Sequence, residues 1–171
     1  MLRIGALDVP DDGLVVMAIV NRTPDSFYDR GSTYELDAAL ARVDRVVAEG
    51  ADMVDVGGVK AAPGAEVDPA EEIRRTVDLV AAIRAAHPSL PISIDTYRAE
   101  VGREALAAGA DVVNDAWGGV DPQLAHVAAE AGAGIVCTHA GGLPPRTRPH
   151  RVTYDDVVAD VLALIPGGDP R

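Results

Sequence analysis

The sequence has little cysteine and little positive charge. Cys137 is the single cysteine in 171 residues, so no internal disulfide can form and nothing indicates an oxidising compartment. We therefore predict a cytoplasmic location. Acidic side chains outnumber basic ones by 27 to 15, and the formal net charge is -12. Nucleic acids and anionic membranes are bound by basic faces, so the composition argues against both as partners and favours small molecules.

Long hydrophobic runs are also missing. No segment approaches the roughly 20 consecutive apolar residues that cross a bilayer. The short N-terminal apolar stretch is accompanied by Asp8, Asp11 and Asp12 and not by the basic region of a signal peptide. We therefore predict no membrane segment. With 48% hydrophobic residues the chain has enough apolar material for one ordinary core, and we predict a single domain over residues 1–171.

A short pattern occurs three times along the chain. Gly50-Ala51-Asp52, Gly109-Ala110-Asp111 and Gly132-Ala133-Gly134 each follow an Ala/Glu-rich stretch and precede an apolar run. A helix that ends at a glycine, followed by a short turn and a buried strand, produces such a pattern. Its repetition indicates successive βα units.

Hydrophobic periodicity and helix-start residues predict five strands that alternate with five helices. The strands are expected at 14–21, 52–57, 91–95, 111–115 and 134–138, and the helices at 33–49, 69–87, 98–108, 122–131 and 154–165. Asp68-Pro69 and Asp121-Pro122 place an acceptor before a proline, as helix starts often do. Ser32 with Glu35, and Thr153 with Asp156, have the spacing of capping pairs.

Polar side chains mark the end of every predicted strand. They are Asn21, Asp55, Asp95, Asn114 with Asp115, and His139. Any one of them could be a turn former or a helix cap, but barrel enzymes build their active sites on this rim. No Gly-x-Gly-x-x-Gly follows the first strand, which argues against a dinucleotide-binding sheet. We predict an α/β fold, a partial TIM (β/α) barrel with parallel strands and about five of the eight βα units.

Four segments resemble the motifs of dihydropteroate synthases, in the same order and at matching spacing. They are Asn21-Arg22-Thr23-Pro24-Asp25-Ser26-Phe27, Asp55-Val56-Gly57-Gly58, Ile92-Ser93-Ile94-Asp95-Thr96-Tyr97 and Asn114-Asp115. Where the first and second loops depart from the family pattern, the changes resemble the divergent second synthase-like paralogue of actinobacteria. Another pterin-binding barrel, the methyltetrahydrofolate methyltransferase domain, shares the Asp and Asn positions, but the first-loop Thr-Pro-Asp-Ser-Phe favours the synthase branch.

The resemblance implies a transferase reaction and assigns residues to it. In this family 6-hydroxymethyl-7,8-dihydropterin diphosphate loses pyrophosphate and is joined to p-aminobenzoate in folate biosynthesis. Asp95 would be the catalytic residue, binding the pterin ring and stabilising its developing positive charge, and Asn114 would be a second pterin contact. Asn21 would hold Mg²⁺ and the diphosphate. Asp55 and His139 are the other expected substrate-binding residues.

The chain departs from the family pattern in two places. The second loop has Val59-Lys60-Ala61-Ala62 where the family has Glu-Ser-Thr-Arg, which removes a hydroxyl and a guanidinium expected near p-aminobenzoate and the diphosphate. Arg22 and Arg30 offer compensating charge. The family's later Asp, Lys and Arg-x-His motifs have no counterpart. An open sheet has unpaired edges, so we predict a homodimer. Two functions stay open: a dihydropteroate-synthase-type transferase, and a non-catalytic pterin- or partner-binding homologue or fragment.

Overall fold

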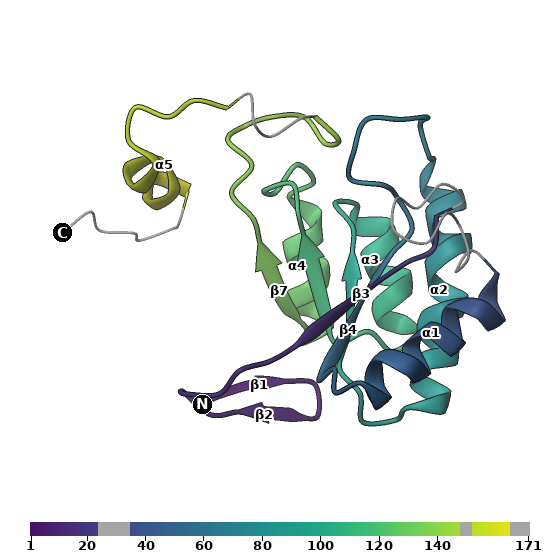
Figure 1. Cartoon of the computed structure of the whole chain (residues 1–171). Helices are drawn as coiled ribbons and strands as arrows, with labels where there is room; N and C mark the ends of the chain where they lie inside the picture. The colour runs from purple at the N-terminus through teal and green to yellow at the C-terminus, as the bar shows by residue number, and fades with distance from the viewer. Residues whose placement is uncertain (24–34, 148–151, 165–171) are drawn as a thin grey trace.

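A five-stranded parallel sheet forms the centre of the structure, a computed structural model that describes residues 1–23, 35–147 and 152–164 (Figure 1). Its strands lie side by side in sequence order, with every neighbouring pair parallel. A doubly wound sheet would reverse its strand order, whereas a barrel does not. The predicted partial barrel is therefore confirmed. The strands are β3 (Met17–Asn21), β4 (Met53–Gly57), β5 (Ile92–Asp95), β6 (Val112–Asp115) and β7 (Gly134–Cys137).

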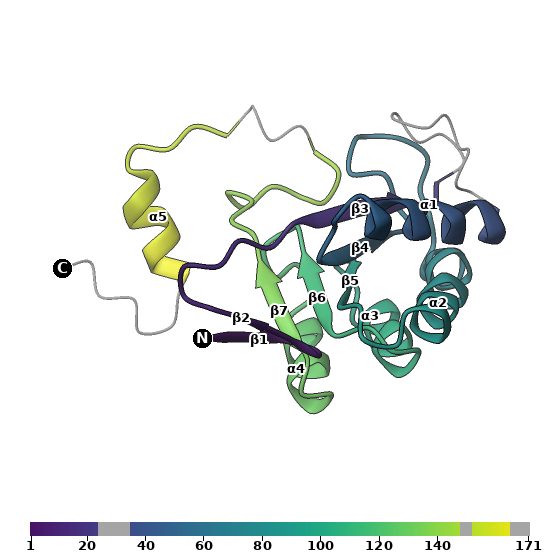
Figure 2. The same ribbon diagram turned by 60° about the horizontal axis from the view of Figure 1, so that its bottom comes forward.

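Four helices cover one face of this sheet (Figure 2). They are α1 (Leu36–Ala48), α2 (Pro69–Ala86), α3 (Ala99–Ala107) and α4 (Gln123–Glu130). The strand side chains on this face are apolar and buried, and with the inner faces of the helices they make the core: Val20, Val54, Val56, Leu79, Ile83, Ile92, Ile94 and Val113. α5 (Val157–Leu164) stands apart from the layer in both views. None of the described helices combines the length and the apolar character needed to cross a bilayer.

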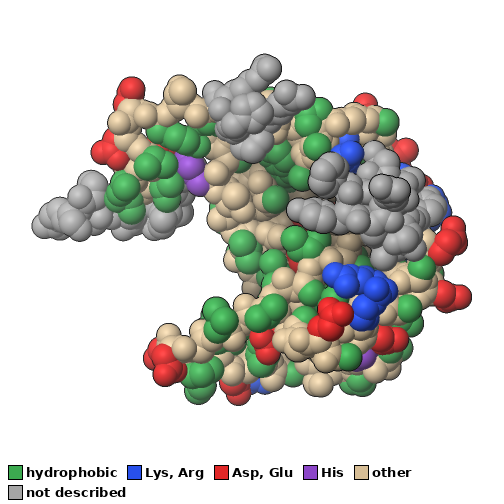
Figure 3. All heavy atoms as spheres, in the orientation of Figure 1, with side chains coloured by type: hydrophobic (Ala, Val, Ile, Leu, Met, Phe, Trp, Pro, Cys, Tyr) green, Lys and Arg blue, Asp and Glu red, His purple; other side chains and the backbone are tan. Residues whose placement is uncertain are grey.

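The opposite face of the sheet is the one that would line a barrel interior. It carries polar side chains toward the carboxyl ends of the strands, and apolar ones such as Ile19 and Val136 on the edge strands. Ile19 is 60% exposed and Val136 is 46% exposed, although both are strand residues. The space-filling view shows a deep indentation between α5 and the N-terminal segment, with hydrophobic side chains at the surface beside it (Figure 3). The rim formed by the carboxyl ends of the strands is the part of this face that carries ionisable and amide side chains.

A hairpin that the sequence reasoning did not predict lies at the N-terminal ends of the strands. β1 (Leu2–Ile4) and β2 (Leu7–Val9) pair antiparallel. Gly5 turns between them with φ +54°, and a Cβ there would lie 2.5 Å from Asp111 Oδ1. A side chain at this turn would therefore collide with the start of β6. Apolar residues alternating around a glycine are a hairpin signal, so the sequence did contain the information.

The predicted elements are present, with small differences at their ends. β3 begins at Met17, later than predicted, because its pairing with β4 begins there. Asp68 caps α2 as predicted and accepts a hydrogen bond from the Glu71 amide at 2.8 Å. Asp121 accepts from the Gln123 amide at 3.0 Å. This bond lies at the start of α4, which begins one residue later than expected, with Pro122 and not Asp121 at its cap position.

Two other helix starts were predicted wrongly. The cap of α5 is Asp156, whose Oδ1 accepts from the amides of Val158 and Ala159, and not Thr153. α1 begins after Glu35, which occupies the cap position without a side-chain cap bond. The predicted cap Ser32 lies outside the described residues. A capping pair consists of two residues only, so it does not by itself fix the residue at which a helix begins.

Candidate functional site

A row of four residues crosses the sheet at the carboxyl ends of its strands. In the register of β3 to β6, Asn21 pairs with Gly57, Gly57 with Asp95, and Asp95 with Asn114. Residues in register point to the same face of a sheet, so the three polar side chains share the open face. A Cβ at Gly57 would lie 2.7 Å from Asn21 Oδ1 and 3.5 Å from Asp95 Oδ2. The glycine therefore leaves space that the amide and the carboxylate occupy.

Asp55 and Ser93 form a deeper polar level on the same face. They precede Gly57 and Asp95 by two residues, pair with each other in register, and are 4% and 0% exposed. Asn114 Nδ2 donates to Asp55 Oδ2 at 3.2 Å, which holds the amide at the rim. Asp55 Oδ1 and Ser93 Oγ are buried without a hydrogen-bond partner among the described residues. Buried polar atoms normally have partners, so these two indicate a place for a polar ligand or water.

Asp95 is set among other carboxyls, and this changes its protonation. Burial, and then the charges of Asp55, Glu72 and Asp115, raise the pKa of Asp95 to about 7. Burial also raises the pKa of Asp55, and the adjacent Ser93 and Asn114 offset only part of that effect. The Ser93 hydroxyl lowers the pKa of Asp55 because it lies close to the carboxylate, although it makes no hydrogen bond of ordinary geometry. At neutral pH, Asp95 is therefore present in both protonation states, as is common in binding and catalytic sites.

A buried ion pair holds the loop after β5 beside Asp95. Glu72, on α2, is fully buried. Its Oε2 accepts from Arg98 Nη1 at 2.6 Å, and its Oε1 accepts from Thr96 Oγ1 at 2.7 Å. Arg98 also donates to the Val67 carbonyl at 2.8 Å and lies 4.8 Å from the centre of the Tyr97 ring. The loop that follows Asp95 is thus attached to the start of α2.

Sequence reasoning missed Glu72 and Arg98. An acidic residue in the first turn of a helix is common because it favours the helix dipole, so Glu72 gave no signal of its own. Burial raises the pKa of Glu72, while Thr96 and Arg98 favour its charged form. Only the packing of α2 against β5 shows that this carboxyl belongs to the surroundings of the site.

Asp115 has a structural role. Its Oδ1 accepts from the Trp117 amide at 2.9 Å and its Oδ2 from the Gly119 amide at 2.7 Å. Both carboxylate oxygens therefore shape the loop after β6, and Asp115 is 2% exposed. It influences the site through its charge on Asp95.

His139 lies in a different environment from the row. Its Nε2 is 2.7 Å from Asp160 Oδ2, and its ring centre is 5.5 Å from that of Tyr154. Both contacts place the imidazole against α5 and the segment before it. No hydrogen bond of the described residues joins His139 to Asp95 or Asn114. Its expected role in substrate binding remains a prediction.

Asp95 lines a narrow pocket. The second loop, residues 58–68, contributes Val59, Lys60 and Ala61 to it, and the other walls are formed by Glu72, Thr96, Tyr97, Trp117 and Arg146. Its volume is about 10 Å³, which is room for about one water molecule. The second loop therefore packs closely against this side of Asp95, while a wider pocket of about 550 Å³ lies on the other side of Tyr97 and Arg146.

Arg22 lies beside the second loop, in contact with α2. Its Nη1 donates to the Arg75 carbonyl at 2.9 Å, and Arg75 Nη1 donates to the Gly58 carbonyl at 3.0 Å. These bonds connect the end of β3 with the beginning of the second loop. The compensating charge expected from Arg22 thus lies near this loop, whereas Arg30 is outside the described residues.

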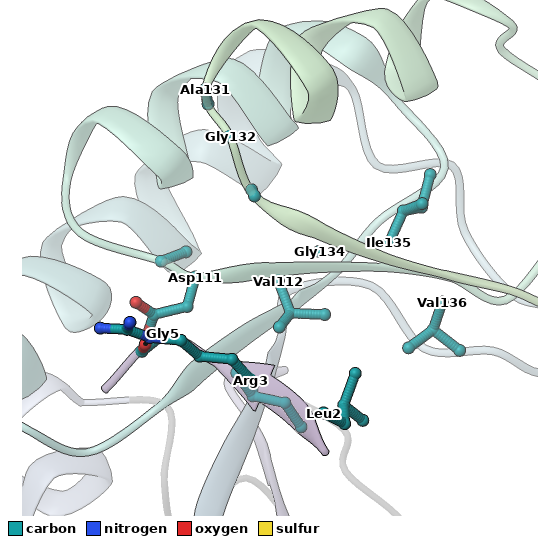
Figure 4. Close-up of a pocket in the computed structure, with 13 residues that line it drawn as sticks. Leu2, Arg3, Gly5, Asp111, Val112, Ala131, Gly132, Gly134, Ile135 and Val136 are labelled. Atoms are coloured by element: carbon teal, nitrogen blue, oxygen red, sulfur yellow. Dashed lines mark hydrogen bonds between the residues drawn. The ribbon is translucent and has the colours of Figure 1, made fainter. Parts of the chain in front are cut away.

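A larger cavity, of about 450 Å³, opens at the opposite end of the sheet between the hairpin and β6 and β7 (Figure 4). Its walls are largely apolar, with Leu2 and Val136 among them. Asp111 Oδ2 accepts from Arg84 Nη2 at 2.6 Å and from the Ile92 amide at 2.9 Å, and Arg3 Nε donates to the Gly5 carbonyl at 3.2 Å. Its ionisable groups thus have structural partners, and the rim is the better candidate site.

Comparison with known proteins gives consistent results. The model of the family described as pterin binding enzyme matches residues 17–165. "Inactive dihydropteroate synthase 2" of Mycobacterium leprae is 56% identical over 163 residues, which cover 91% of this chain and 56% of that protein. Dihydropteroate synthase of Bacillus subtilis is 42% identical over 151 residues, covering 87% of this chain and 50% of that protein.

Solved structures agree with the sequence comparison. The Burkholderia cenocepacia dihydropteroate synthase complexed with 7,8-dihydropteroate aligns with a TM-score of 0.76 at 37% identity, covering 95% of this chain and 54% of that one. The chain spans about half the length of the curated relatives that it matches.

Proposed function

This chain belongs to the pterin-binding enzyme family, and from that premise we propose that Asp95 and Asn114 bind the pterin ring of 6-hydroxymethyl-7,8-dihydropterin diphosphate. The observation that carries the proposal is the position of Asp95, a partly buried carboxyl in register with Asn114 on the open face. The ring N–H and the amino group of a pterin form a donor-rich edge, which a carboxylate accepts in charge-assisted bonds. The Asn114 amide can donate and accept beside it.

The chemistry open to such a site is that of a dihydropteroate synthase. The bond between the methylene carbon and the diphosphate breaks, and its electron pair leaves with pyrophosphate. The amine of p-aminobenzoate then forms the new C–N bond and loses a proton. In this scheme the Asp95 carboxylate stabilises the positive charge that develops on the pterin ring.

We further propose that this chain retains the pterin part of the site and has lost the part that binds p-aminobenzoate. Ala61 and Ala62 stand where the family has a hydroxyl and a guanidinium in the second loop, and the pocket that Asp95 shares with this loop has a volume of only about 10 Å³. The relative from Mycobacterium leprae that is 56% identical carries the word inactive in its name. The expected behaviour is therefore pterin binding without synthase turnover.

Calorimetry separates binding from turnover. The chain is titrated with 6-hydroxymethyl-7,8-dihydropterin diphosphate in the presence of Mg²⁺, and p-aminobenzoate is then added while dihydropteroate is assayed. We expect saturable binding at one site per chain and no product. Product formation would support the transferase, and absence of pterin binding would refute the proposed site.

The residues at the rim also fit a Mg²⁺ ion. Magnesium keeps several waters and takes few protein ligands plus phosphate oxygens. The Asn21 amide oxygen is a hard ligand of this kind and lies beside the Asp95 carboxylate across Gly57. Among the described residues no group of three His, Cys, Asp or Glu side chains is placed to hold a metal. We therefore propose that Asn21 contributes to a Mg²⁺ held mainly by the diphosphate, where the ion would neutralise the leaving group.

Substitution of Asn21 tests this assignment. In the parent chain, chelation of Mg²⁺ is expected to weaken diphosphate binding about tenfold, while Asn21→Ala binds equally with and without the ion. Affinities are measured by calorimetry with and without EDTA. The pterin alcohol, which lacks the diphosphate, serves as the control. It is expected to bind the parent chain and Asn21→Ala with the same affinity. A full Mg²⁺ effect in Asn21→Ala would exclude the role.

Gly57→Ala tests the geometry of the row. The new methyl group would lie 2.7 Å from Asn21 Oδ1, so the amide must move. We expect pterin diphosphate affinity to fall about tenfold to a hundredfold, the range that small misplacements of binding groups produce. Gly134→Ala is the matched control, because its Cβ would lie 3.4 Å from Val112 Cγ2, an ordinary contact. Equal affinity of the two variants would contradict the arrangement.

The homodimer and the cytoplasmic location remain predictions. The exposed apolar residues on the open face, such as Ile19 and Val136, support the first because a second chain could cover them. The single, unpaired Cys137 supports the second.

A further inference from the structure

Arg146 adopts an unusual backbone conformation beside the second loop. Its φ is 65°, and it is the one non-glycine residue with positive φ in the described part of the chain. Such a conformation is uncommon for a residue with a side chain and often accompanies a functional constraint. The constraint here is visible in the hydrogen bonds of its guanidinium.

The Arg146 guanidinium is surrounded by carbonyl groups of the second loop. Nε donates to the Lys60 carbonyl at 3.1 Å, Nη1 to the Ala65 carbonyl at 2.6 Å, and Nη2 to the Ala62 carbonyl at 3.3 Å. A Cβ at Gly64 would lie 2.9 Å from Nη2, so the backbone also approaches closely at that point. One side chain from the segment after β7 thus holds three peptide groups of residues 60–65.

We propose that Arg146 determines the specificity of this site: it latches residues 60–65 beside Asp95 and excludes an aryl amine from the position next to the pterin. The latched segment supplies Lys60 and Ala61 to the pocket that Asp95 lines, and Arg146 itself forms part of the wall. The remaining volume of about 10 Å³ suits about one water molecule and is far too small for a benzene ring.

The sequence of the second loop leaves its carbonyls available to Arg146. Ala61 and Ala62 have no polar side chain that could compete for the carbonyls of the loop, so the carbonyls of Lys60 and Ala62 accept from Arg146. The guanidinium presents N–H groups in a fixed plane and can reach several acceptors at once. Lysine, with a compact ammonium, cannot reproduce this pattern.

The exclusion of an aryl amine rests on the proposed pterin site, but the latch does not. Limited trypsin digestion under native conditions therefore tests the latch in the ligand-free chain, with cleavage after Lys60 as the readout. In Arg146→Ala we expect this cleavage to accelerate by about tenfold or more, because the loop loses the three bonds that hold its carbonyls and a protease cleaves a loop that leaves its folded position. Arg146→Lys is expected to recover part of the resistance. Arg103→Ala, at an exposed arginine on α3, is the control and should be cleaved after Lys60 at the parent rate. An unchanged rate of this cleavage in Arg146→Ala would overturn the latch.

Titration with p-aminobenzoate tests the exclusion. Each variant is titrated both alone and saturated with pterin diphosphate. Arg146→Ala is expected to bind p-aminobenzoate about tenfold more tightly than the parent chain, since the binding-competent open loop becomes populated. A gain in affinity cannot arise from misfolding. Equal or weaker binding under both conditions would overturn the proposal. Failure of pterin diphosphate to bind either chain would refute the proposed function alone.

Discussion

Arg98→Met is expected to lower the free energy of unfolding by about 3–5 kcal/mol, because it leaves a buried carboxylate without its cation. Glu72 is fully buried, and its Oε2 lies 2.6 Å from Arg98 Nη1. The Thr96 hydroxyl remains as a donor to Oε1 but carries no charge. Urea denaturation at pH 7 measures the change. Methionine keeps much of the length of the arginine stem, so loss of packing contributes less than loss of charge.

Two comparisons isolate the ion pair. Adding Glu72→Gln to Arg98→Met removes the unpaired charge and is expected to restore most of the lost stability. Arg74→Met is the matched control, because Arg74 pairs with Glu71 on the same helix but is 60% exposed. It should cost about 1 kcal/mol or less. A double variant no more stable than Arg98→Met would show that packing, and not charge, dominates.

The pH dependence of the Arg98→Met deficit gives a further check. Burial raises the pKa of Glu72 above its ordinary value, and loss of Arg98 removes an opposing charge. Since the folded state then binds a proton more tightly than the unfolded state, stability rises as the pH falls. The deficit is expected to shrink as the carboxyl becomes protonated.

Asp95→Asn is expected to stabilise the chain at alkaline pH and to abolish most of its pterin binding. The pKa of Asp95 is about 7 in the folded chain against an ordinary value of 3.8. Between these values the folded state holds a proton that the unfolded state has lost, so stability falls as the pH rises through this window. Asparagine removes the buried charge. We expect a gain of about 1–3 kcal/mol at pH 8, allowing for screening, and none at pH 3.5.

Asp95→Asn is expected to weaken pterin binding, although it stabilises the fold. A neutral amide cannot make the charge-assisted bonds that a carboxylate makes with the pterin edge, so the affinity of Asp95→Asn should fall about a hundredfold. In the parent chain, affinity should rise with pH by up to about tenfold per unit below pH 7, because binding requires the ionised carboxyl. Asp78→Asn, at an exposed residue of α2, matches the change in net charge and should leave binding and stability unaltered. An Asp95→Asn chain that binds normally would refute the role of Asp95.

Much of the site was predictable because parallel strands bring their carboxyl ends to one edge. Asn21 and Asp95 are the last residues of β3 and β5, Asn114 is the last but one of β6, and strand order places them in one row. Glu72 and Arg98 are 26 residues apart, and Arg146 is 81 to 86 residues from the carbonyls that it contacts. No local pattern links such pairs. His139 lies two residues beyond the end of β7, yet its contacts are with Tyr154 and Asp160.

The sequence by itself determined the βα alternation, the family, and the acidic and amide groups of the rim, because hydrophobic period, glycine punctuation and motif order are local properties of the chain. Only the tertiary structure decided how these groups are paired and charged. Burial of Asp95 among Asp55, Glu72 and Asp115, and closure of the second loop by Arg146, depend on contacts between distant segments. Desolvation and Coulomb energies act through space, so they exist only once those segments have packed together.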